Sequence, residues 1–97
     1  MPLTSEDMVE FRLYVVGDLP NSRCAIQNLH AYCNEHLPGR HRIEVLDVFE
    51  VPQRALADHI LLTPQLVVVS SGGTRHIVGD LSEPAAIGQA TLKRIIL

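Results

Sequence analysis

The stretch that sets the fold is Phe11-Arg12-Leu13-Tyr14-Val15-Val16-Gly17-Asp18-Leu19-Pro20-Asn21-Ser22. Its first half is aromatic and β-branched and is followed directly by glycine, as is typical of a strand with both faces largely buried. Its second half is turn-forming, and Asn21 or Ser22 can cap a helix by accepting a hydrogen bond from a free N-terminal amide. The stretch therefore predicts a strand that turns at once into a helix.

Apolar spacing and helix breakers outline the rest of the chain. Apolar residues from Ala25 to Leu37 recur every three or four positions, which predicts one helix face, and Pro38-Gly39 ends that helix. The same reasoning predicts a strand over residues 41–49, a short helix from Pro52 to about Leu62, a strand over residues 66–69, a glycine-rich reversal over residues 70–74, a strand over residues 75–78 and a last helix from Leu81 to Ile96.

The order of these elements is β-α-β-α-β-β-α, which is the thioredoxin-like order. We expect two β-α-β units with parallel strands, and a closing hairpin and helix that complete a four-stranded mixed sheet flanked by helices. The 97 residues leave room for one domain. We place that domain at residues 10–97, after a loose acidic leader over residues 1–9.

Composition and charge exclude several classes of function. A formal net charge of −3 argues against nucleic-acid binding driven by bulk electrostatics. No stretch approaches the roughly 20 apolar residues that span a bilayer, and the acidic, polar beginning does not resemble a signal peptide. We therefore expect a cytoplasmic protein with neither a nucleic-acid nor a membrane partner.

The thiols do not fit dithiol redox chemistry. That chemistry needs a C-x-x-C pair at the start of the first helix, where the sequence reads Pro20-Asn21-Ser22-Arg23. Cys24 and Cys33 are nine residues apart, which places them on opposite sides of the helix and about 13 Å apart along its axis. A redox site built on Cys24 alone remains an alternative, with Pro64 as the proline that faces the first helix in thioredoxin-like folds.

Other polar residues predict no catalytic, cofactor or metal site. The five histidines form no ligand motif, and no glycine-rich phosphate loop is present. Asp58 is expected to face solvent on its short helix, and Asp80 to cap a helix or form a turn. Residues 40–42 form a small basic patch, which is either a solvated turn or a contact for an acidic partner surface.

Four segments, taken together, resemble the KaiB family. They match the patterns L-Y-V-x-G-x-x-P-N-S, D-V-x-x-x-P, I-L-x-T-P-x-L and I-I-G-D-L-S in that order, at residues 13–22, 45–53, 57–66 and 77–82. The resemblance extends from about residue 11 to residue 92. It implies a non-enzymatic clock regulator that binds the ring of a KaiC-type ATPase and modulates its phosphorylation cycle.

The resemblance also suggests where partners bind. The candidate contacts are Asn21 and Arg23 on the first helix, and Arg40 and Arg42 before the second strand. An alternative from a different class is a sensory or adaptor module that binds a signalling kinase, as the thioredoxin-like domain of the kinase SasA does.

KaiB proteins are known for a second fold, usually tetrameric, in which the C-terminal half is rearranged. The candidate residues for such a switch are Thr63, Pro64, Gly79, Asp80 and Leu81. In this chain a glycine pair in residues 70–74 replaces the family's proline-rich connection and favours a hairpin, and residues 67–69 favour a strand. We therefore expect the thioredoxin-like arrangement, as a monomer or as a homo-oligomer of two or four chains.

Overall fold

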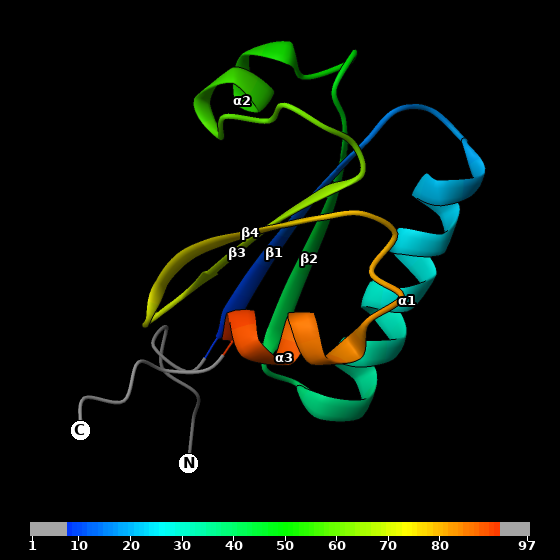
Figure 1. Ribbon diagram of the computed structural model, residues 1–97. Coiled ribbons are helices and arrows are strands. Elements are labelled where there is room, and N and C mark those ends of the chain that lie inside the picture. Colours follow the sequence, from blue (N-terminus) through cyan, green and yellow to red (C-terminus); the bar gives the residue numbers. More distant parts are fainter. Residues whose placement is uncertain (1–7, 92–97) are drawn as a thin grey trace.

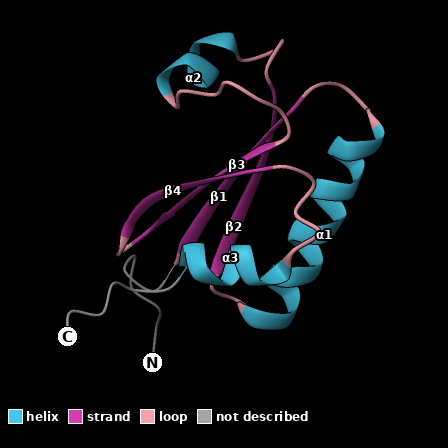
Figure 2. Cartoon of the chain, in the orientation of Figure 1, coloured by secondary structure: helices cyan, strands magenta, loops and turns pink. Residues whose placement is uncertain are grey.

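The predicted order of strands and helices is the order found in the computed structural model, which describes residues 8–91 (Figures 1 and 2). The elements are β1 (Val9–Val15), α1 (Pro20–His36), β2 (His41–Asp47), α2 (Pro52–Ala57), β3 (Gln65–Ser70), β4 (Gly73–Val78) and α3 (Pro84–Thr91). The strands form one mixed sheet in the order β2-β1-β3-β4. The expected thioredoxin-like fold class is confirmed.

The second crossover differs from the prediction. β1 and β2 are parallel, as expected, but β3 runs antiparallel to β1, so the structure contains one parallel β-α-β unit and not two. β3 runs antiparallel because α2 is too short to carry the chain back along the length of the sheet. The six residues of α2 rise only about 9 Å, while a seven-residue strand spans about 23 Å. The chain therefore enters β3 at the end of the sheet where β2 finishes.

Helix boundaries also differ from the prediction. Neither Asn21 nor Ser22 caps α1, because Pro20 is its first residue and no side chain bonds its free amides. Proline suits that position, since its fixed φ is helical and it has no N–H to satisfy. α2 ends at Ala57 and not near Leu62, because the chain turns at Asp58 and the next residue has a left-handed φ of 58°.

At the chain ends, β1 begins at Val9, the last residue of the predicted leader, while residues 1–7 of that leader lie outside the described residues. α3 begins at Pro84 and not at Leu81, because Leu81 has a left-handed φ of 62° and enters the core. The predicted continuation of this helix over residues 92–96 also lies outside the described residues.

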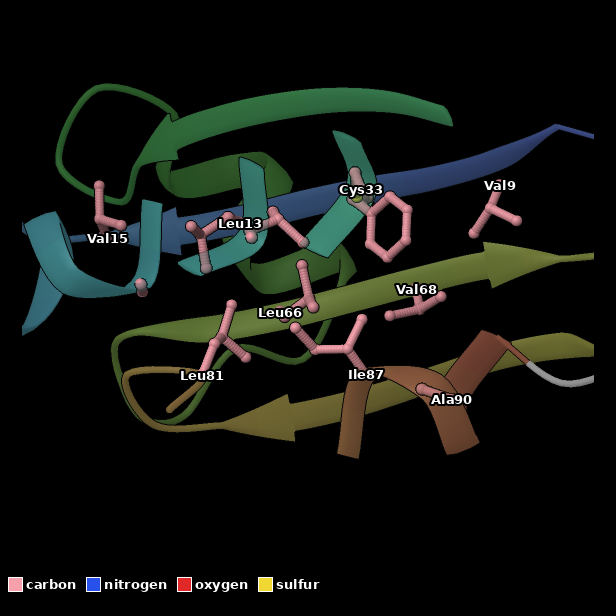
Figure 3. Close-up of a cluster of buried hydrophobic side chains, with 12 residues drawn as sticks. Val9, Leu13, Val15, Cys33, Leu66, Val68, Leu81, Ile87 and Ala90 are labelled. Carbon is pink, nitrogen blue, oxygen red and sulfur yellow. The ribbon is translucent and has the colours of Figure 1, made fainter. Parts of the chain in front are cut away.

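The core lies on both faces of β1 because its side chains alternate between them. Phe11, Leu13 and Val15 pack with buried residues of α1 and α3 on one face (Figure 3). Tyr14 packs with Leu46, Ala55 and Val67 beneath α2 on the other face. The fully buried large side chains each contribute about 1.5–3 kcal/mol, so β1 holds the two layers together.

Cys33 belongs to the first of these clusters and Cys24 does not, which gives a matched pair of variants. Cys33→Ser should lower the free energy of unfolding by about 1–3 kcal/mol, because it buries a hydroxyl in an apolar site. Cys24→Ser, on the exposed side of the same helix, should change it by less than about 0.5 kcal/mol. Denaturant unfolding measures both values, and equal midpoints would contradict the packing of Cys33.

Candidate functional site

One end of the sheet gathers most of the residues that the sequence singles out. β1, β2 and β4 finish there and β3 begins there, since Val15 pairs with Asp47 and Gln65 pairs with Val78. We call it the Pro64 end. In Figure 1 it carries α2 and the start of α1. The opposite end, where β1 and β2 begin, is the Arg40 end.

A groove at the Pro64 end faces the start of α1. It has a volume of about 270 Å³ and is lined by residues 19–22 on one side and by Thr63 and Pro64 on the other. The Thr63–Pro64 peptide bond is cis. Because Pro64 and residues 19–22 line the same groove, Pro64 lies opposite the first helix, in the position that the order of elements predicts.

Hydrogen bonds hold Pro64, Gly79 and Asp80, three of the candidate switch residues. Gly79 N–H donates to the carbonyl of Pro64 at 2.9 Å, so the two segments touch. The Asn28 side chain of α1 donates to the Asp80 carbonyl at 2.9 Å, and the Asp80 carboxylate accepts from Ser82 N–H at 3.0 Å. Asp80 is thus a turn former, as predicted, and it ties the segment after β4 to α1.

The structure separates the four candidate partner contacts into two pairs. Asn21 and Arg23 lie exposed at the Pro64 end, and the Arg23 guanidinium is 3.6 Å from the exposed carboxylate of Asp18. Arg40 and Arg42 lie exposed at the other end, beyond the last turn of α1. The helix between them rises about 20 Å, so the four residues do not form one compact patch.

The groove contains no thiol. Residues 20–23 occupy the start of α1, where dithiol chemistry would place its cysteines, and Cys24 is exposed without lining the groove. Burial raises the pKa of the Cys33 thiol to about 12, which keeps it protonated and inert at neutral pH. Both cysteines are free.

A half-buried polar cluster beneath α2 was not predicted. Asp58, expected to face solvent, is only 17% exposed and accepts two hydrogen bonds from Arg12 Nη1, at 2.8 and 2.9 Å, and one from the Tyr14 hydroxyl. Arg12 also contacts Glu10 at 3.2 Å. Arg12 and Tyr14 precede Asp58 by 46 and 44 residues in the chain. The one sequence signal for the cluster was the alternation that places Arg12 and Tyr14 on the same face of β1.

The cluster shifts the pKa values of Tyr14 and Asp58. Burial, together with the hydrogen bond to Asp58, raises the pKa of Tyr14 to about 12. Desolvation alone would raise the pKa of Asp58, but the hydrogen bonds from Tyr14 and Arg12 and the charge of Arg12 outweigh it and lower that pKa. The Asp58 carboxylate is therefore charged at neutral pH and fastens the chain after α2 to β1.

Residues 8–91 offer neither a metal-binding cluster nor a membrane-spanning helix. In that range no three His, Cys, Asp or Glu side chains are grouped to hold a metal ion. Within the same residues, no helix is long and apolar enough to cross a membrane.

The fold and the groove define a thioredoxin-like domain whose first helix begins without the cysteine pair. Solved structures agree on the fold: Malassezia sympodialis thioredoxin gives a TM-score of 0.72 at 21% identity, covering 92% of this chain and 80% of that one. Mitochondrial thioredoxin 3 of Saccharomyces cerevisiae gives 0.70 at 16% identity, covering 88% and 77%. At such identities the likeness concerns the fold alone.

Sequence relatives define the family. The family model of the KaiB domain matches residues 12–91, and this chain belongs to the KaiB family. Circadian clock protein KaiB3 of Synechocystis sp. is 36% identical over 74 residues, covering 76% of this chain and 72% of the relative. Circadian clock oscillator protein KaiB of Microcystis aeruginosa is 42% identical over 72 residues, covering 74% and 69%. The Prochlorococcus marinus protein of that name is 39% identical, and the match spans 63% of its length.

Asp58→Asn should destabilise the protein in a pH-dependent way. The folded-state pKa of Asp58 lies below the unfolded value of about 3.9, so its contribution is fully present above that pH and is lost as pH falls through the folded pKa. We expect the variant to be about 1–2 kcal/mol less stable at pH 7, with the difference shrinking below about pH 4.

The measurement is the free energy of unfolding of both proteins by denaturant at several pH values. Asp18→Asn is the matched control, because the Asp18 side chain is 84% exposed and its replacement should change the free energy of unfolding by less than about 0.5 kcal/mol. A difference for Asp58→Asn that persists unchanged in acid would contradict the charged role of this carboxylate.

Gly79→Ala should also destabilise this arrangement, through the backbone. A Cβ at Gly79 would meet no atom within 4 Å, but its φ of 120° is a conformation that side chains rarely adopt. We expect a loss of about 1–3 kcal/mol in thermal or denaturant unfolding. Gly39→Asn, at a φ of 69° that asparagine tolerates, should cost much less, and equal losses would contradict this account.

Proposed function

We propose that this chain is a non-enzymatic clock regulator that binds the ring of a KaiC-type ATPase and modulates its phosphorylation cycle. Membership of the KaiB family supports the clock role. The observation that carries the proposal is the groove between Pro64 and the start of α1, which keeps the position of a peptide-facing site while residues 20–23 supply no thiol. Such a groove can bind a protein without the means to oxidise or reduce it.

The spacing of the cysteines argues against the redox alternative. A disulfide needs Cα atoms within about 7 Å, whereas nine helical residues separate Cys24 from Cys33 by about 13 Å. Cys33 is also fully buried, so it is not available to a partner thiol. A redox role would rest on Cys24 alone, which lies outside the groove.

The contacts with the ring would involve Asn21 and Arg23 at the Pro64 end and Arg40 and Arg42 at the other. Because about 20 Å of helix separates the pairs, a single compact patch on the ATPase cannot engage both. We propose that each pair contacts a different part of the ring surface. At the Arg40 end, the exposed guanidinium groups of Arg40 and Arg42 suit acidic side chains on that surface.

A fold switch, where it occurs, would act through residues 63–64 and 79–81. In the thioredoxin-like arrangement these segments are joined by the bond from Gly79 to Pro64 and held to α1 by Asn28. A state populated at about 1% lies only about 2.7 kcal/mol above the major one. Differences of that size are comparable to two or three such hydrogen bonds, so partner binding can select one arrangement.

Native mass spectrometry tests the proposal, using this chain alone and mixed with a KaiC-type ATPase from the same genome and ATP. We expect a ring loaded with several copies, and Arg42→Glu should weaken loading by about tenfold, a loss typical of a charge removed from an interface. Arg75→Glu, an equal charge reversal on exposed β4, is the control and should load normally.

Each other outcome has a definite meaning. If the Arg42→Glu variant loads onto the ring as well as the wild type does, the Arg40 end does not contact the ring. No complex in any nucleotide state would overturn the clock-ring proposal and transfer the function to an adaptor that binds a signalling kinase. The free-state mass reports in the same experiment whether the chain is a monomer, a dimer or a tetramer.

A further inference from the structure

Exposed apolar side chains are concentrated at the Pro64 end. The described part of the chain exposes seven large hydrophobic residues, and all of them except Val45 on β2 lie at the Pro64 end. The other six are Leu19 (55% exposed), Phe49 (79%), Leu56 (76%), Leu61 (89%), Leu62 (62%) and Val78 (53%). We call these six residues the apolar end. Apolar groups gathered on one part of a soluble protein mark a surface that binds another molecule.

The backbone of Leu61 and Leu62 is held in place by a buried side chain. The Gln65 amide is only 5% exposed, and its carbonyl oxygen accepts hydrogen bonds from the backbone N–H groups of Leu61 and Leu62 at 3.3 and 3.4 Å. Its nitrogen donates to His76 Nδ1 at 2.8 Å. The backbone is thus fixed while both leucine side chains face solvent, so their exposure is a property of the ordered loop.

Charge at the apolar end is negative. Glu50 follows Phe49 and Asp47 lies two residues before it, and neither carboxylate is in an ion pair among the described residues. The Asp47 carboxylate accepts hydrogen bonds from the backbone N–H groups of Gly17 and Phe49, so its charge is held at this end. The two arginines of this end are each matched, Arg23 by Asp18 and Arg54 by Glu44. A second copy docked apolar end to apolar end would bring these carboxylates against each other. A partner with lysine or arginine beside its apolar side chains would match them.

We propose that the apolar end is the docking surface for a partner protein segment that presents apolar side chains flanked by basic ones. The inference rests on the proposed function in that it assigns this segment to the ATPase ring. The leucines at positions 61 and 62 supply the buried area, and the acidic residues around Phe49 set the orientation. The groove beside Pro64 continues the same surface through Leu19.

Leu61→Asn is the test, with Leu61→Met as its matched control. At 89% exposure neither change should alter the unfolding midpoint. Affinity for the same ATPase, measured by titration, should fall at least about tenfold for Leu61→Asn and stay within about threefold for Leu61→Met, since methionine keeps the apolar area. Glu50→Lys should weaken binding at low salt, and the difference should shrink at high salt.

The outcomes separate the two proposals. If the wild type binds the ATPase and Leu61→Asn binds equally well, this inference is wrong and the proposed function stands. If the wild type does not bind, both are wrong. If the free chain forms a dimer that Leu61→Asn dissociates, the surface belongs to a second copy, and the basic partner segment is overturned.

Discussion

The structure depends on β1 being covered on both faces and paired on both edges. Its odd-numbered residues pack under α1 and α3, while Arg12 and Tyr14 face α2. One seven-residue strand therefore anchors two layers of different chemistry, one fully apolar and one with an ion cluster at its centre. Because β2 and β3 pair with this strand and the helices pack over its two faces, its alternation sets the two layers of the fold.

The parts of the fold that short-range chemistry controls could be predicted from the sequence. Residues 13–22 alone indicate the strand and helix, and the glycines of residues 70–74 indicate the hairpin. The direction of β3 could not be predicted by the same means, because it depends on the length of α2. Its end at Ala57 in turn depends on a carboxylate bonded to a strand 46 residues earlier. Periodicity carries no information about such a contact.

The candidate site, like the fold, has one part that the sequence predicts and another part that it does not. The proline of residues 63–64 could be placed opposite the first helix from the order of elements, and the structure has it there. Gly79 is linked to Pro64 by a backbone hydrogen bond, and Asp80 is linked to α1 by the Asn28 side chain. Both contacts are long-range, so no motif spacing indicates them. The separation of Asn21 from Arg40 follows from the length of α1, which the sequence does indicate.

The ion cluster beneath α2 and the apolar end are physically connected. Asp58 fastens the end of α2 to β1, and the chain that leaves it carries Leu61 and Leu62 outward before Gln65 pairs in β3. Exposing leucines brings no stability to the free chain, and fixing their backbone costs conformational entropy. The two polar anchors on either side, Asp58 and Gln65, offset that cost before any partner arrives. A surface ordered in advance loses less entropy on binding, which suits the docking role that we propose for the apolar end.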